Sequence, residues 1–177
     1  MKAKDLILEA ANVAYQGATK IENNVLSRST EARTEILSLA SRTRDLYEGM
    51  GRVLKAISTR IPGEAGSDIA LSLGSYFYVV VYSNEFVVVR GKPFHIMMSY
   101  SKGGERIGLK TRYLTAYLGL NSMEVSLYSI KTKLLIGSLE DYITNYNELK
   151  YVLKPLNNIV ERYLEPLVEA RLGVSPK

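Results

Sequence analysis

Continuous apolar runs followed by apolar–polar alternation extend from residue 76 to residue 112, and this pattern predicts two β-hairpins in series. The first hairpin is predicted over 76–82 and 85–90, two runs of β-branched and aromatic residues, with Ser83-Asn84 as a two-residue turn. This register pairs Val81 with Phe86 and leaves both faces apolar. The first hairpin is therefore expected at the centre of a sheet.

The second hairpin is predicted over 94–101 and 105–112, with its turn at Gly103-Gly104. Its register pairs Met98 with Leu109, which makes one face apolar and the other polar and basic. A slip of one residue would turn the basic side chains toward the core, so the alternation favours this register. The expected apolar face of the sheet comprises Phe77, Val79, Val81, Phe86, Val88, Ile96, Met98, Ile107 and Leu109.

Residues 3–60 have apolar residues at helical spacing and no proline, which predicts a helical segment. The apolar positions step by three and four residues, as in a heptad repeat, and a polar stretch at 27–30 separates two halves that are out of phase. Either one long helix carries a stutter, or two antiparallel helices meet in a turn near 23–30; we favour two helices. We call these apolar positions the N-terminal seam. Its candidate interface residues are Ile7, Ala14, Ile21, Leu39 and Leu46.

The two segments that flank the hairpins have weaker patterns. Residues 61–75 are rich in Pro and Gly and are expected to form a connector. After the hairpins, 113–118 is compatible with a helical turn or a strand, and 123–129 and 133–136 are expected to be strands.

A C-terminal helix is predicted over 138–173. It begins with Ser138 and Asp141 in the spacing of a capping box, and kinks or restarts are expected at Pro155 and Pro166. The chain is thus predicted to be a single α+β domain over 1–177. Its parts are a helical pair (1–60), a connector (61–75), an antiparallel meander of five or six strands (76–137) and a kinked C-terminal helix (138–173).

Composition excludes several classes of site. The chain has no cysteine and one histidine, His95, so disulfides, thiolate chemistry and a histidine-based metal site are excluded, and no cofactor is expected. No apolar run approaches about 18 residues, and Asp5 and Glu9 interrupt the N-terminal one, so we expect no membrane span and no signal peptide, and hence a cytoplasmic protein. The absence of Cys and Trp beside 13 Tyr would suit a thermophile.

The polar face of the second hairpin is the candidate functional surface. With 23 Lys and Arg against 18 Asp and Glu, the net charge of +5 permits binding to nucleic acid. Cations beside exposed rings are typical of proteins that bind single strands or RNA. The alternatives are a solvated face whose cations serve solubility, or tyrosines covered by a helix. The candidate nucleic-acid-binding residues are Arg106, Lys110, Arg112, Lys102, His95, Tyr78 and Tyr82.

We therefore predict a non-catalytic protein, a homodimer, that binds DNA or RNA through a basic sheet face. The alternative is a structural or assembly protein that pairs with itself or a partner through the N-terminal seam, although the seam could instead pack on the sheet within one chain. One histidine without a positioned nucleophile or carboxylate makes a poor active site, so neither an enzyme nor a small-molecule substrate is predicted. A pocket between the sheet and the C-terminal helix has no polar constellation to support it in the sequence.

Overall fold

The computed structural model describes residues 2–28, 33–66, 68–74, 77–82, 86–91 and 95–173, and for 86–91 and residue 171 it describes the backbone alone. The chain begins with a helical hairpin of α1 (Ala3–Asn24) and α2 (Thr34–Ser58), with a short 3₁₀ turn, η1 (Leu26–Arg28), after α1. The preference for two helices over one is confirmed.

One antiparallel sheet follows, with its strands in chain order from β1 to β8. The strands are β1 (Ile69–Gly74), β2 (Phe77–Tyr82), β3 (Phe86–Gly91), β4 (Ile96–Ser101), β5 (Arg106–Lys110), β6 (Leu114–Gly119), β7 (Ser122–Leu127) and β8 (Ile130–Leu135). Each strand pairs with its successor, so the sheet is a simple meander. The ambiguous segment at 113–118 is a strand, β6.

The C-terminal helical region restarts at Pro166, as predicted, but one helix continues through Pro155, and a break at Asn145 was not predicted. Its elements are α3 (Leu139–Thr144), α4 (Tyr146–Asn158), a π-helical segment η2 (Ile159–Leu164) and α5 (Glu165–Leu172). The Ser138 hydroxyl accepts from the Asp141 N–H, and the Asp141 carboxylate accepts from the Ser138 N–H, which confirms the predicted capping box. Pro155 lies inside α4, and Pro166 lies in the first turn of α5.

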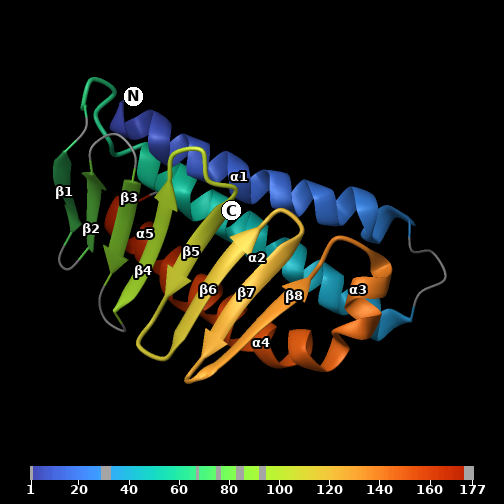
Figure 1. Ribbon diagram of the computed structural model, residues 1–177. Helices are drawn as coiled ribbons and strands as arrows, with labels where there is room; N and C mark the ends of the chain where they lie inside the picture. The colour runs from blue at the N-terminus through green and yellow to red at the C-terminus, as the bar shows by residue number, and fades with distance from the viewer. Residues whose placement is uncertain are drawn as a thin grey trace.

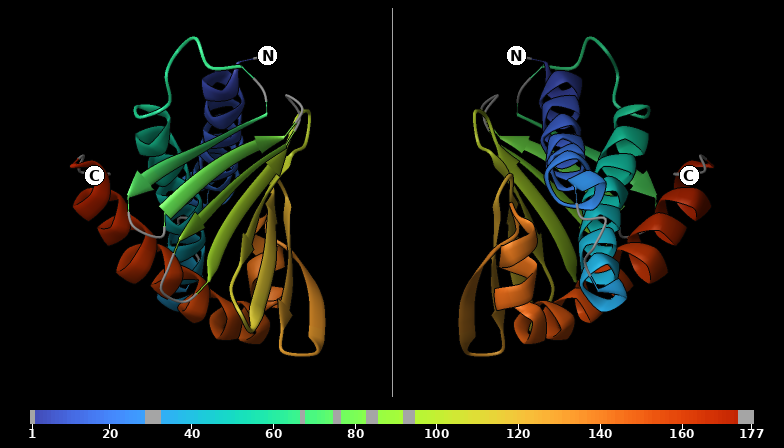
Figure 2. Two further views of the ribbon diagram at one scale, coloured as in Figure 1. Left: turned by 90° about the vertical axis from the view of Figure 1, so that its left-hand side faces the viewer. Right: turned by 90° about the vertical axis from the view of Figure 1, so that its right-hand side faces the viewer.

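The described helices all lie against one face of the sheet (Figure 1 and Figure 2). Helix α1 contacts β3, β5 and β6, while α2 packs against α1 on one side and against α4, η2 and α5 on the other. At the two ends of the sheet, α5 reaches β1 and α3 reaches β8. The α+β fold class, with its helical pair, antiparallel meander and kinked C-terminal helix, is confirmed.

The N-terminal seam is buried inside the chain. All five candidate interface residues are at most 4% exposed, because α1 packs against α2 and the sheet, and α2 packs against α1 and the C-terminal helices. The prediction that these side chains form an intermolecular interface is therefore wrong: packing within the chain already buries them. They are Ile7, Ala14, Ile21, Leu39 and Leu46.

Two details of the predicted strands need correction. The predicted connector at 61–75 contains β1, which extends the meander to eight strands. In the first hairpin Val81 pairs with Val87, not with Phe86, because three residues and not two separate the paired ends of β2 and β3. The register pairs the backbone of Phe86 and Val88 with Tyr82 and Val80, and not with residues of the predicted apolar face. The side chains of Phe86 and Val88, which were predicted to lie in the core, are outside the described residues. The predicted pairing of Met98 with Leu109 is confirmed.

Two buried tyrosines join the helical layer to the sheet. The Tyr47 hydroxyl on α2 donates to the Gly119 carbonyl oxygen at 2.6 Å, and the Tyr100 hydroxyl on β4 donates to the Glu9 carboxylate on α1 at 2.8 Å. Burial raises the pKa of Tyr47 well above its usual value, and burial, with the Glu9 carboxylate, raises that of Tyr100. Both hydroxyls therefore stay protonated in the folded protein at pH values at which the tyrosines of the unfolded protein ionise.

We expect the free energy of unfolding to fall as the pH rises above about 10, the usual tyrosine pKa. Above this pH the folded protein binds more protons than the unfolded protein, because the two tyrosines have a raised pKa only in the folded state. The stability that each tyrosine contributes is therefore complete below about pH 10 and is lost above it, by at most about 1.4 kcal/mol per pH unit. Urea unfolding at several pH values measures the slope, and Tyr100→Phe should reduce it. A flat profile up to about pH 11 would contradict this account.

Close approach of α1 and α2 depends on glycine at the helix contact. A Cβ at Gly17 would overlap the ring of Tyr47, and a Cβ at Gly51 would lie 2.9 Å from a ring carbon of Tyr15. Tyr47 is 1% exposed and its hydroxyl is bonded to the sheet, so its ring has no room to retreat. Glycine destabilises an isolated helix at this position, but its lack of a side chain permits α1 and α2 to pack closely against each other.

Gly17→Ala should destabilise the protein by about 1–3 kcal/mol, although alanine favours a helix, because overpacking a rigid contact outweighs propensity. Chemical denaturation gives the difference. Gly63→Ala is the matched control, since nothing lies within 4 Å of a Cβ there, and its effect should be near zero. Equal stability of the two variants would show that Tyr47 can move aside.

Candidate functional site

The sheet face opposite the helices, which we call the open face, carries a row of residues that crosses all eight strands. The register aligns Ser72, Tyr78, Arg90, Met97, Lys110, Thr115, Ser126 and Lys131 in sequence from β1 to β8. Neighbouring strands lie about 4.8 Å apart, so Tyr78 and Lys110 are about 14 Å apart at the backbone, and Lys110 and Lys131 are equally spaced. The row thus places a ring and two cations at regular intervals.

Arg106, which was predicted to contact phosphate, already has partners on the open face. Its guanidinium lies 3.3 Å from a carboxylate oxygen of Glu124 on β7 and 4.9 Å above the ring of Tyr117 on β6. Arg106 therefore positions the Tyr117 ring and neutralises Glu124. Lys110, also predicted, is exposed on the same strand.

Three functional candidates on this face were missed in the sequence: Tyr117, Lys131 and Lys133. Tyr117 pairs with Gly108, whose lack of a side chain lets the ring lie against the sheet. Together with Glu124 and Ser126, the three candidates line a hollow of about 270 Å³. Alternation in β7 and β8 could have placed both lysines outward, but β8 was expected to begin only at residue 133.

The tyrosines of the open face are accessible. Tyr78, Tyr82 and Tyr117 are 42%, 45% and 40% exposed, so the alternative in which a helix covers them does not apply to the described residues. They stand on β2 and β6, on either side of the Lys110 strand.

Three predicted residues lie away from this face. Arg112 and His95 are found together at the strand ends where β4 begins and β5 ends, beside the C-terminal helix. Lys102 lies at the other end of these strands, in the β4–β5 turn, where the Gly103 N–H donates to Glu9. The seven predicted residues are therefore divided among three places, and Arg106, Lys110, Tyr78 and Tyr82 share the open face.

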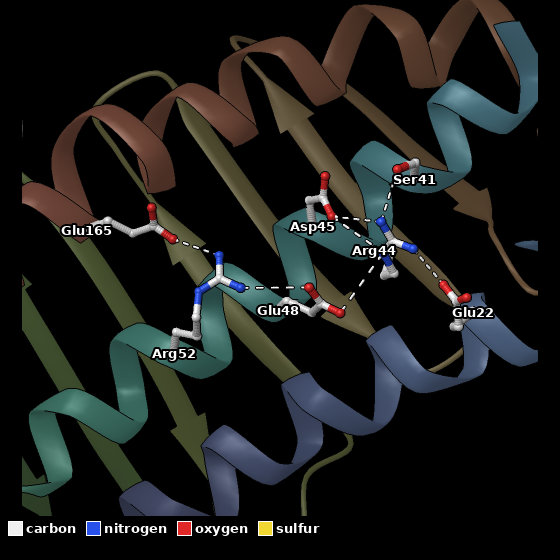
Figure 3. A network of polar contacts seen from close by, with 7 residues as sticks. All are labelled: Glu22, Ser41, Arg44, Asp45, Glu48, Arg52 and Glu165. Carbon is white, nitrogen blue, oxygen red and sulfur yellow. Dashed lines mark hydrogen bonds and ion pairs between the residues drawn. The ribbon is translucent and has the colours of Figure 1, made fainter. Parts of the chain in front are cut away.

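A second cluster of charges lies in the helical layer (Figure 3). Arg52 on α2 lies 3.0 Å from the Glu165 carboxylate of α5 and 3.7 Å from Glu48, and Arg44 lies 2.6 Å from Glu22 of α1. The hydrogen bond that Arg44 donates to Glu22 raises the Arg44 pKa further. Each carboxylate drawn has an arginine partner, so this network joins the three helices and offers no free acid or base.

No group of three or more His, Asp or Glu side chains is gathered for a metal ion within the described ranges. Among the same residues, no helix is both long and apolar enough to cross a bilayer. Comparison of the chain with protein-family models, with curated proteins and with solved structures finds no match. A functional proposal therefore depends on the geometry of this chain alone.

Glu165→Ala should lower the free energy of unfolding by about 1–3 kcal/mol, since it leaves the half-buried Arg52 guanidinium without its closest carboxylate. Chemical denaturation measures the loss. Glu169→Ala, an exposed carboxylate on the same helix, is the control and should change stability by less than about 0.5 kcal/mol. If both variants behaved alike, the network would be no more than a set of surface ion pairs.

Proposed function

We propose that the protein binds single-stranded nucleic acid across the open face of the sheet, without catalysis. The observation that carries this proposal is the cross-strand row with Tyr78, Lys110 and Lys131 at regular spacing. Rings that stack on bases and cations that contact phosphates are the two elements of a single-strand platform.

The charge of the open face supports this proposal. Its described charged residues are four cations, Arg106, Lys110, Lys131 and Lys133, and one acid, Glu124. Because Arg106 neutralises Glu124, the three lysines leave an uncompensated positive field. Such a field attracts phosphates and makes affinity depend on salt.

The shape of the face favours a single strand over a duplex. The major groove of a duplex is about 12 Å wide and admits a helix or a two-stranded ribbon, whereas eight strands about 4.8 Å apart form a far wider surface. In a duplex the bases are stacked on each other and cannot reach exposed rings. Unstacked bases can lie on Tyr78 and Tyr82.

Replacing Lys110, Lys131 and Lys133 together by alanine should weaken binding of a labelled single strand at least about tenfold at low salt. It should also reduce the slope of log K against log salt by about 2, since each phosphate contact on a single strand contributes about 0.7. Fluorescence anisotropy with single-stranded DNA, single-stranded RNA and duplex across a salt series measures both quantities.

The matched control removes the same charge from the helical layer by replacing Lys55, Lys150 and Lys154, all exposed, with alanine. Its affinity and salt slope should stay close to those of the wild type. Equal losses in the two triple variants would mean that net charge alone drives binding. Tighter binding of duplex than of single strands would contradict the role given to the tyrosines.

A cytoplasmic location and a homodimer remain predictions, and light scattering on the same sample tests the latter.

A further inference from the structure

The C-terminal helix passes the sheet on the side of the helical layer (Figure 1). A cavity of about 480 Å³ lies between this helix and the strand ends. Its walls come from His95 and Ile96 at the start of β4, from the β5–β6 turn with Arg112, and from α4 and η2. The volume is within the range of small-molecule sites, about 300–1,000 Å³. The cavity is separate from the open face.

Three irregular features of the backbone meet at this cavity. His95 has a positive φ of 52°, which is uncommon for a residue with a side chain. Pro155, which lines the cavity, stands inside α4 and removes a helical donor. The π-helical segment η2 begins at Ile159, also a lining residue. Strained residues and π-helical turns are concentrated at functional sites in proteins.

The lining combines an aliphatic part with a basic mouth. Ile96, Leu114, Leu127 and Ile159 are buried or half-buried and supply the apolar wall. The charged lining residue is Arg112, which is exposed and makes no ion pair with a described carboxylate. No Asp or Glu is among the described residues that line the cavity.

We propose that this cavity binds a small aliphatic carboxylate. Its hydrocarbon chain would lie against the isoleucine and leucine side chains, and its carboxylate would accept hydrogen bonds from the Arg112 guanidinium, which is suited to a planar, bidentate anion. The Arg112 guanidinium lies 5.5 Å from the centroid of the Tyr113 ring, which keeps it at the mouth of the cavity. The Tyr113 ring in turn packs against Tyr128, with 5.4 Å between the ring centroids. The Asn158 amide and the Thr111 hydroxyl are further polar groups of the lining.

Calorimetric titration with three probes of equal chain length tests this proposal: decanoate, decanol and decylamine. All three probes bury the same hydrocarbon chain, so the head group determines the order of their affinities. Decanoate should bind at least about tenfold tighter than decanol, and decylamine should bind most weakly. Arg112→Gln should weaken decanoate about tenfold and leave decanol unchanged, whereas Arg42→Gln, an exposed arginine on α2, should change neither.

A second variant tests the location independently of charge. Asn158→Trp places a large ring at a half-buried position of the lining and should abolish binding of decanoate and decanol alike, with the circular dichroism spectrum unchanged. Absence of saturable decanoate binding by the wild type would overturn the proposal, as would equal affinity for decylamine. Undiminished binding by the Asn158→Trp variant would also overturn it. Displacement of decanoate by a short oligonucleotide would assign the cavity to the nucleic-acid path instead.

Discussion

Tyr47 is fully buried at the point where α1, α2 and the sheet meet. Its ring lies against Gly17 of α1, and its hydroxyl donates to the carbonyl oxygen of Gly119 at the end of β6. One side chain therefore fixes both the distance between the two helices and their distance from the sheet. Because the helices are fixed in this way, the apolar residues of the N-terminal seam are used within the chain, and one face of the sheet receives all of the described helical cover.

When helices cover only one face of a sheet, the side chains on the other face can change with little effect on the packing of the core. Alternation sends Lys110 outward while Leu109 and Ile107 are buried beside it. Gly108 is the exception, since it gives up a side chain so that the Tyr117 ring can lie across the sheet under Arg106. The arrangement holds the ring in place and leaves it 40% exposed.

The sequence predicts best where the local pattern and the tertiary environment agree. Period-2 alternation gave the second hairpin, with Met98 opposite Leu109, and Ser138 with Asp141 gave the start of α3. The first hairpin is apolar on both faces, so nothing in its pattern distinguishes a turn of two residues from one of three, and the register was wrong by one. Lys131 was missed because the start of β8 is polar and resembles a loop, and Lys133 stood at the first position of the predicted strand. Arg112 follows the alternation of β5, but the strand ends at Lys110, so the pattern could not place it.

The two proposed sites differ in how the fold produces them. The open face is regular: each of its side chains follows from strand alternation and register, so its chemistry is readable once the register is known. The cavity depends on local departures from regular structure, since His95 has a positive φ, Pro155 lacks a helical donor inside α4, and η2 is π-helical. Departures of this kind cost free energy, and a chain that needed only a stable core could have avoided a proline inside α4. Their convergence on one cavity is therefore a stronger indication of function than its volume.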